Sequence, residues 1–139
     1  MKASPEILTT KHKQMLSKLG VQAIYLFGSR ALQTHTAASD YDYAILMPNK
    51  GHSKGDDVYF ALYNLLAEIS PRTLENDIID IVYLRDVGLE LRFHVIRYGQ
   101  VIYDVNPRAR INFEVETDLL YCDYRPLLDE FDKTILESL

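Results

Sequence analysis

An apolar run that stops at a Gly-Ser pair, with an Asp-x-Asp pair ten residues later, constrains this chain more than any other feature. Residues 24–27 (Ile-Tyr-Leu-Phe) precede Gly28 and Ser29, and Asp40 and Asp42 lead into a second apolar run. Short apolar runs bounded by turn residues predict two strands joined by a connection. Since successive side chains of a strand alternate faces, we expect Asp40 and Asp42 to project the same way.

This stretch has the chemistry of a site for a metal ion and a phosphate. Two carboxylates on one strand face repel each other unless a cation compensates their charge, and Mg2+ prefers oxygen ligands of this kind. Gly28 would allow the backbone to approach a ligand closely. Ser29 and the amides after it would meet a phosphate at the start of a short helix.

A third acidic residue interrupts a β-branched run at 78–84, which predicts another strand. Asp80 lies inside this run, and an unpaired charge in a buried strand is strongly unfavourable, so Asp80 must be paired or bound to a metal ion. Asp77 is the competing candidate. It lies three residues earlier, on the opposite face of the strand and nearer the loop, and Asp80 is therefore preferred.

The spacing of Gly28-Ser29 and Asp40-x-Asp42 resembles the signature of the nucleotidyltransferase superfamily of the DNA polymerase beta type. With its short length, the chain resembles the minimal nucleotidyltransferases (MNT) of that superfamily over nearly its whole length. These MntA-like proteins are prokaryotic antitoxins paired with HEPN-domain ribonuclease toxins. The resemblance implies an α+β fold, with a mixed β-sheet flanked by helices and a C-terminal helical segment.

The resemblance also implies a reaction. AMP would pass from ATP to a tyrosine hydroxyl of a cognate HEPN toxin, which would neutralise the toxin. Two Mg2+ ions would be held by Asp40, Asp42 and Asp80, which are thus the candidate catalytic and metal-binding residues. Candidate contacts to the triphosphate are Gly28, Ser29 and Arg30.

The whole chain fits one domain. Its 139 residues are expected to form a single minimal nucleotidyltransferase domain, 1–139, with a helical segment over about 106–139. Helices are predicted after Ser4-Pro5, over 56–69 and from Asp86 to 98, and a short strand over 101–103. A break or kink is expected near Pro126.

Charge and hydropathy exclude several classes of protein. The net charge of -5 argues against direct nucleic-acid binding, although it leaves room for a local basic patch. No apolar run approaches the roughly 20 residues that span a bilayer, and no signal-peptide pattern follows Met1, so a cytoplasmic protein without membrane contact is expected. The lone Cys122 is interpreted as a packing residue.

The turn-rich stretch 48–55 predicts a loop. It is not a P-loop, because Gly51 is followed by His52 rather than by Lys-Ser or Lys-Thr at a helix start. Lys50 and Lys54 are interpreted as solvated, with contact to a triphosphate or a partner as the alternative.

Three other functions are compatible with parts of the sequence. A binding-only antitoxin would inhibit by occlusion, but the three retained carboxylates weaken this reading. Nucleotidyl transfer to a small molecule would be expected to need an additional substrate domain, and none is evident. A ribonuclease is indicated only by Arg30-x4-His35, which lacks the aromatic residue usual two positions later, where Ala37 stands.

Overall fold

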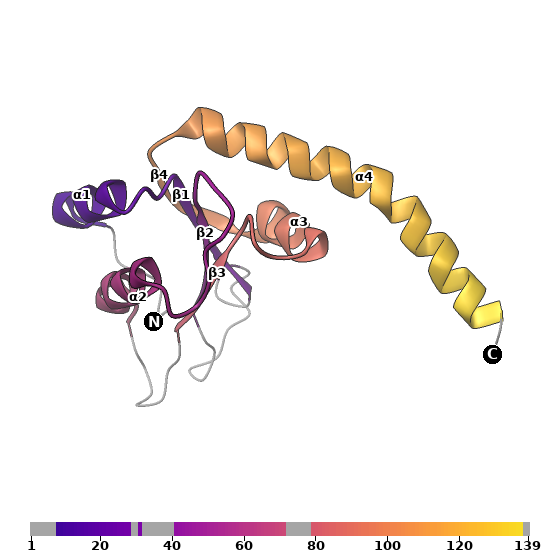
Figure 1. Ribbon diagram of the computed structural model, residues 1–139, viewed down its shortest axis with the longest axis horizontal. Coiled ribbons are helices and arrows are strands. Elements are labelled where there is room, and N and C mark those ends of the chain that lie inside the picture. Colours follow the sequence, from indigo (N-terminus) through magenta and orange to yellow (C-terminus); the bar gives the residue numbers. More distant parts are fainter. Residues whose placement is uncertain (1–7, 29–30, 32–40, 72–78, 138–139) are drawn as a thin grey trace.

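A four-stranded sheet with helices on both faces is the framework of the computed structural model, which describes residues 8–28, 31, 41–71 and 79–137 (Figure 1). Its strands are β1 (Ala23–Phe27), β2 (Tyr41–Leu46), β3 (Ile79–Tyr83) and β4 (Gln100–Asp104). Its helices are α1 (Thr10–Lys18), α2 (Asp57–Ile69), α3 (Leu89–Tyr98) and α4 (Pro107–Glu137). The expected α+β fold with a mixed sheet and a C-terminal helix is confirmed.

The strand order β3-β2-β1-β4 makes the sheet mixed. Strand β1 pairs antiparallel with both β2 and β4, whereas β2 and β3 are parallel. Parallel neighbours need a long crossover, and α2 lies in the connection between β2 and β3. As a result, the end of β1 and the starts of β2 and β3 meet at one edge of the sheet.

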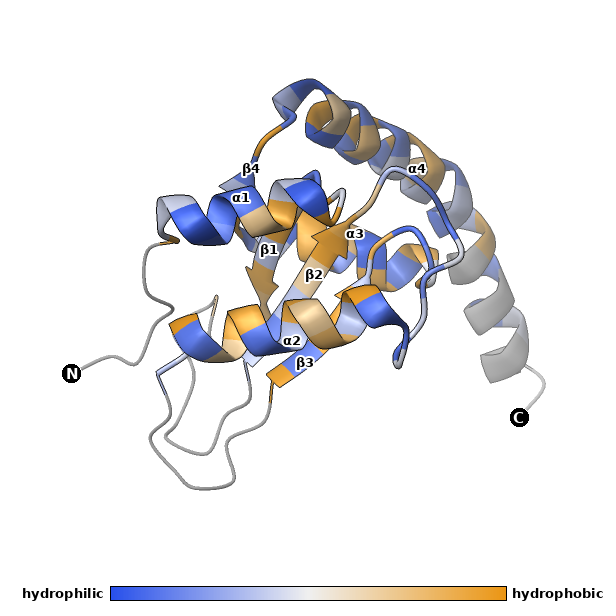
Figure 2. Ribbon diagram, turned by 60° about the vertical axis from the view of Figure 1, so that its left-hand side comes forward, coloured by the Kyte–Doolittle hydropathy of each residue, from blue (hydrophilic) through white to orange (hydrophobic). Residues whose placement is uncertain are grey.

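Alternation along the strands divides the core into two layers, one on each face of the sheet. On the first face, Leu16 of α1 and Leu62 and Leu66 of α2 pack against Tyr43 and other alternate strand residues. On the second face, Val95 of α3 and Phe113 of α4 pack with Tyr25, Ala44 and Leu46. Figure 2 shows α1 and α2 on one side of the sheet and α3 and α4 on the other. Each fully buried Leu or Val contributes about 1.5–3 kcal/mol by leaving water.

Helix α1 begins later than the Ser4-Pro5 pair predicted, and that pair lies outside the described residues. A capping box starts the helix at Thr9. The Thr9 hydroxyl accepts the backbone N–H of His12 at 3.2 Å, and the His12 ring accepts the backbone N–H of Thr9 at 3.2 Å. This exchange satisfies two of the amide groups that a helix start leaves without partners.

Helix α4 packs on the rest of the protein through its first half. Phe113 and Thr117 are buried, whereas the side chains beyond them that the structure describes are mostly exposed. Cys122 is one of these, so the interpretation of Cys122 as a packing residue is wrong. The helix is continuous through Pro126 and bends in its second half (Figure 1), so no break occurs there. Of the helices in the described residues, none is long and apolar enough to cross a membrane.

Arg110 fastens the start of α4 to the sheet. Its guanidinium donates to Asp104 of β4 and to Glu114 of α4, both at 2.6 Å, and the Tyr25 hydroxyl of β1 donates to Glu114 at 2.8 Å. The Arg110 side chain is only 22% exposed. The network therefore joins two strands to the first turns of α4 in a partly dehydrated setting.

We expect Arg110→Met to lower the free energy of unfolding by about 1–3 kcal/mol, because it leaves two partly buried carboxylates without their cation. Urea denaturation of both proteins measures this. Arg108→Met is the matched control, because Arg108 is exposed on the same helix and has no ion pair with any described residue. An equal loss in the two variants would contradict the role given to the network.

Candidate active site

Asp42 and Asp80 lie side by side at the end of the sheet where β1 ends and β2 and β3 begin, which is called the carboxylate edge below. Asp42 pairs with Phe27 across the antiparallel ladder and with Asp80 across the parallel one. Directly paired residues on neighbouring strands point to the same face of a sheet. Both carboxylates therefore face the side of the sheet covered by α3 and α4. Asp42 is half-buried, and the Asp80 side chain is 38% exposed.

Gly28 follows β1 and lies against Asp42. It has a φ of 75°, which residues with a side chain rarely adopt. A Cβ added to Gly28 would lie 3.3 Å from Cγ of Asp42 and would overlap its Oδ2 atom. A glycine is thus needed here for a second reason besides backbone approach to a ligand, namely to leave room for the Asp42 carboxylate.

Lys54 occupies the exposed side of Asp80. Its Nζ atom donates to Oδ1 of Asp80 at 2.8 Å. The hydrogen bond to Asp80 and the charge of that carboxylate raise the pKa of Lys54, so the lysine is cationic at neutral pH. The interpretation of Lys54 as a purely solvated residue is therefore wrong. The expectation that Asp80 lies in a buried strand holds for one face of β3, where Ile79, Ile81 and Tyr83 are buried, but Asp80 lies on the partly exposed face. The expectation that its charge is paired is met by Lys54.

The loop that carries Lys54 is held in place from the far end of β3. Asp86, which was predicted to cap the next helix, instead accepts the backbone N–H groups of Gly51 at 2.8 Å and His52 at 3.3 Å. Helix α3 begins after Gly88 without a side-chain cap. The His52 ring also lies against Tyr83, with 5.0 Å between ring centroids. These contacts limit how far Lys54 can move from Asp80.

Gln100 is a site residue that the sequence did not reveal. It starts β4, pairs with Leu26, and its side-chain N–H donates to the carbonyl of Ala31 at 2.8 Å. Ala31 follows the candidate phosphate contacts Ser29 and Arg30 in the sequence. Gln100 therefore ties Ala31 to the sheet. The only signal in the sequence was a polar residue opening an apolar strand.

The remaining predicted site residues lie outside the described residues: Ser29, Arg30, Asp40 and the competing acid Asp77. Within the part of the chain that the structure describes, no three His, Cys, Asp or Glu side chains gather closely enough to hold a metal ion. Two carboxylates abreast on adjacent strands nevertheless fit a hard divalent cation, since it binds oxygen ligands from several chain segments. Asp42 and Asp80 are the described residues that would hold it.

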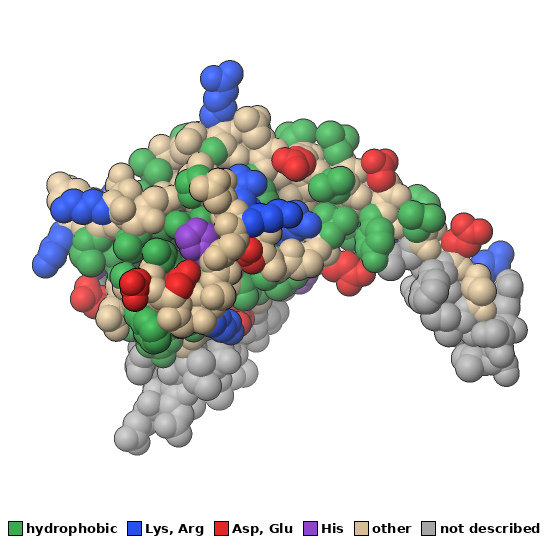
Figure 3. Space-filling model, viewed as in Figure 1, with side chains coloured by type: hydrophobic (Ala, Val, Ile, Leu, Met, Phe, Trp, Pro, Cys, Tyr) green, Lys and Arg blue, Asp and Glu red, His purple; other side chains and the backbone are tan. Residues whose placement is uncertain are grey.

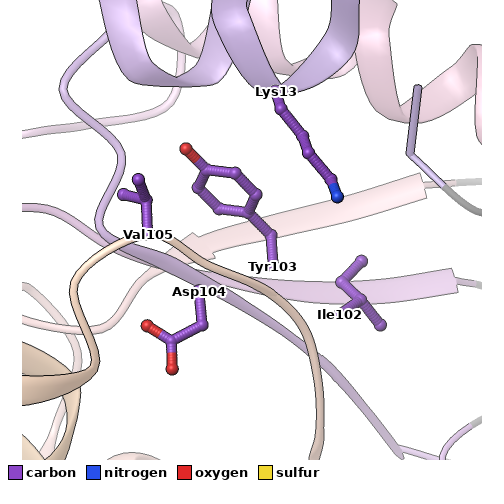
Figure 4. Close-up of a pocket in the computed structure, with 5 residues that line it drawn as sticks. All are labelled: Lys13, Ile102, Tyr103, Asp104 and Val105. Atoms are coloured by element: carbon purple, nitrogen blue, oxygen red, sulfur yellow. The ribbon is translucent and has the colours of Figure 1, made fainter. Parts of the chain in front are cut away.

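A cavity of about 210 Å3 lies at the opposite end of the sheet (Figure 4). It is lined by Lys13 of α1, by Ile102, Tyr103 and Asp104 of β4, and by Val105. The Tyr103 hydroxyl is buried there without a hydrogen-bond partner among the described residues. Since Asp104 pairs with Ala23 at the start of β1, this cavity is remote from the carboxylate edge and is not part of the candidate site.

Comparison with known proteins identifies the fold around this site. A family model described as polymerase beta, nucleotidyltransferase, matches residues 10–108. No curated protein sequence matches the chain significantly. The match spans both carboxylates, the Gly28 turn, Lys54 and Gln100.

Solved structures share the fold at low identity. One chain of a toxin-antitoxin structure with AMP-PNP is 23% identical with a TM-score of 0.59, and the likeness covers 88% of this chain and 98% of that one. One chain of a tyrosine-to-alanine mutant of a toxin-antitoxin described as MntA-HpeT is 22% identical with a TM-score of 0.59, and the likeness covers 91% of this chain and 98% of that one. One chain of the structure of tri-AMPylated Shewanella oneidensis HEPN toxin in complex with MNT antitoxin is 21% identical with a TM-score of 0.52. That likeness covers 89% of this chain and 98% of the other.

Proposed function

Because the chain belongs to the polymerase beta-type nucleotidyltransferase family, we propose that it transfers AMP from ATP to a tyrosine hydroxyl of a cognate HEPN toxin and so neutralises that toxin. The observation that carries the proposal is the register that sets Asp42 beside Asp80, with Gly28 packed against Asp42. The likeness to toxin-antitoxin structures supports the choice of partner. We place the reaction in the cytoplasm, and treat 1–139 as one minimal nucleotidyltransferase domain.

In the proposed reaction the tyrosine oxygen attacks the α-phosphorus of ATP. A new P–O bond forms to the tyrosine, the bond to the β-phosphate breaks, and pyrophosphate leaves. Asp40, Asp42 and Asp80 would hold two Mg2+ ions, which when bound neutralise the triphosphate and acidify the attacking hydroxyl. Asp80, on the exposed edge strand, accepts the hydroxyl proton.

The turn after β1 would bind the nucleotide. Ser29 donates to a β- or γ-phosphate oxygen, and Arg30 neutralises charge on the departing pyrophosphate. Gly28 keeps the backbone close to both the phosphates and Asp42. Gln100 binds the carbonyl of Ala31, which follows these residues in the sequence.

Lys54 should compete with Mg2+ for Asp80, because its ammonium group already offsets the charge of that carboxylate and would repel a cation bound to it. We expect Lys54→Met to lower the Mg2+ concentration that gives half-maximal transfer to about one third or less. This is the change that loss of one exposed ion pair, worth up to about 1 kcal/mol, would produce. A titration of transfer against Mg2+ measures this. Lys50→Met is the matched control, since Lys50 lies on the same loop and forms no ion pair with the described residues. An unchanged Mg2+ requirement in Lys54→Met would contradict the competition.

The experiment that tests the proposed function is co-expression with a candidate HEPN toxin, which the proposal expects to be encoded beside this chain. Mass spectrometry of the toxin should show one or more added AMP units on a tyrosine. The pair Asp40→Asn and Asp42→Asn should give none. Purified protein with ATP, Mg2+ and toxin should reproduce the mass increase, and its absence in both settings would overturn the proposal.

A binding-only antitoxin remains the second candidate, because apolar side chains are exposed along α4, as Figure 3 shows over the projecting helix. They include Ile111, Val115, Leu119, Leu120 and Leu127. Such a surface suits contact with another protein. Cell survival distinguishes the two functions. Full protection by the folded but unreactive Asp40→Asn and Asp42→Asn protein would favour occlusion, and loss of protection would favour catalysis.

A further inference from the structure

A cleft of about 630 Å3 lies between helices α3 and α4, outside the carboxylate site. This volume is within the range of small-molecule sites in proteins. The side chains that line it come from both helices and are mainly aromatic or basic. They include Phe93, Arg97 and Tyr98 from α3, and Asp118, Tyr121 and Arg125 from α4.

Aromatic rings form one part of the lining. The rings of Phe93 and Tyr121 stack across the helices, with 3.8 Å between centroids and 10° between planes. Tyr98 adds a ring that is 49% exposed. Planar bases stack on exposed aromatic rings with little regard to sequence, at about 1–3 kcal/mol per base. Phe93 and Tyr121 cover one face of each other, so the exposed ring of Tyr98 is the stacking surface that the cleft offers to a planar group.

Two arginines supply the charge. Arg97 and Arg125 reach the cleft from opposite helices, and neither forms an ion pair with a side chain that the structure describes. Asp118 is the acid among the lining residues, so the lining carries an excess of one positive charge in a chain of net charge -5. Guanidinium groups bind phosphate oxygens in a bidentate manner. An aromatic surface beside two available guanidinium groups fits a base joined to a phosphate.

The cleft is on the same face of the sheet as the carboxylates. Asp42 lies on the same face of β2 as Ala44 and Leu46, which pack with Val95 of α3 and Phe113 of α4. The C-terminal end of α3 also reaches the carboxylate edge, because a Cβ at Gly99 would lie 3.3 Å from the carbonyl oxygen of Leu26. Both sites therefore lie on the face of the sheet that α3 and α4 cover.

We propose that the cleft between α3 and α4 is a second nucleotide site, which takes a nucleoside monophosphate group with its base on the exposed ring of Tyr98 and its phosphate between Arg97 and Arg125. The role of the site rests on the proposed function: it would hold an AMP group already attached to the toxin while the carboxylate site takes another ATP. Binding of free AMP itself does not depend on that function.

Equilibrium dialysis with labelled AMP, without Mg2+, ATP or toxin, tests the site directly. The full chain should bind AMP, and Arg97→Glu with Arg125→Glu should weaken binding at least about tenfold, as loss of a charged phosphate contact predicts. Arg108→Glu with Lys133→Glu is the matched control, because it reverses two exposed charges of α4 outside the cleft and should leave AMP affinity unchanged. Arg97→Gln with Arg125→Gln gives the same test without charge reversal, and circular dichroism verifies the fold of each variant.

Tyr98→Ala distinguishes a nucleotide from a bare anion. It should weaken AMP binding severalfold and leave competition by inorganic phosphate unchanged. No AMP binding at millimolar concentration, or equal affinity in the parent and both arginine variants, would overturn the second site. Loss of AMP binding in Asp42→Asn, with the arginine variants unaffected, would assign the nucleotide to the carboxylate site and overturn it as well. Absence of AMP transfer with cleft binding intact would count against the proposed function alone.

Discussion

Asp42→Asn should reduce AMP transfer by about a thousandfold or more, equivalent to about 4 kcal/mol of transition-state stabilisation, while the protein stays folded. The amide keeps the size of the side chain beside Gly28 but loses the charge that holds a metal ion against its hydration. Asp42 also pairs with Asp80 in the sheet, so its loss removes one of two adjacent carboxylates at the edge. Incorporation of labelled AMP into the toxin measures the effect.

Asp57→Asn is the matched control for Asp42→Asn. Asp57 is an exposed acid in the first turn of α2, and its change removes one negative charge far from the paired carboxylates in sequence. It should leave transfer within about twofold of the parent, as surface changes generally do. A folded Asp42→Asn protein with ordinary activity at saturating Mg2+ would refute the assignment of the metal site.

Gly28→Ala should cost stability and most of the activity at once. The φ of 75° strains any side chain by about 1–2 kcal/mol, and the new Cβ would overlap Oδ2 of Asp42. Since the Asp42 carboxylate must move, transfer should fall by at least about a hundredfold, as misplacement by 1 Å can do. Thermal denaturation and transfer assays on the same samples measure both effects.

Gly20→Ala separates strain from displacement of Asp42. Gly20 has a similar φ of 84°, but a Cβ there would meet only Met47 Cε at an ordinary 3.8 Å. It should therefore lose stability as Gly28→Ala does and keep its activity. Equal transfer by the two variants would show that Gly28 does not act through Asp42.

The framework was predictable because local patterns dictate it. Apolar β-branched and aromatic runs gave the strands, and the acids at 56–57 mark the start of α2, where Asp56 accepts the N–H of Tyr59 at 2.7 Å. The start of α1 was missed because the capping box uses His12 at the position where Glu or Gln is usual, so Thr9 does not stand out as the residue before a helix. Near Pro126 a break or a kink was expected, and α4 continues through it and bends in its second half.

Contacts between distant segments were not predictable from spacing. The register of Asp42 with Asp80 depends on strands separated by a whole helix, and the choice of Asp80 over Asp77 rested on its position in the run. Lys54 reaches Asp80 only because Asp86 holds the loop from the far end of β3. Gln100 contacts Ala31 across 69 positions of sequence. The roles of Ser29, Arg30 and Asp40 stay predictions, because these residues lie outside the described part of the chain.

The ion pair between Lys54 and Asp80 also bears on how the sheet forms. Asp42 and Asp80 carry like charges on neighbouring strands, so their repulsion opposes the pairing of β2 with β3. The lysine places a positive charge beside one of them at 2.8 Å from within the chain itself. Unlike a zinc finger, whose folding free energy comes from its metal, this chain supplies a cation of its own beside the paired carboxylates, so part of their repulsion is offset without a bound metal ion.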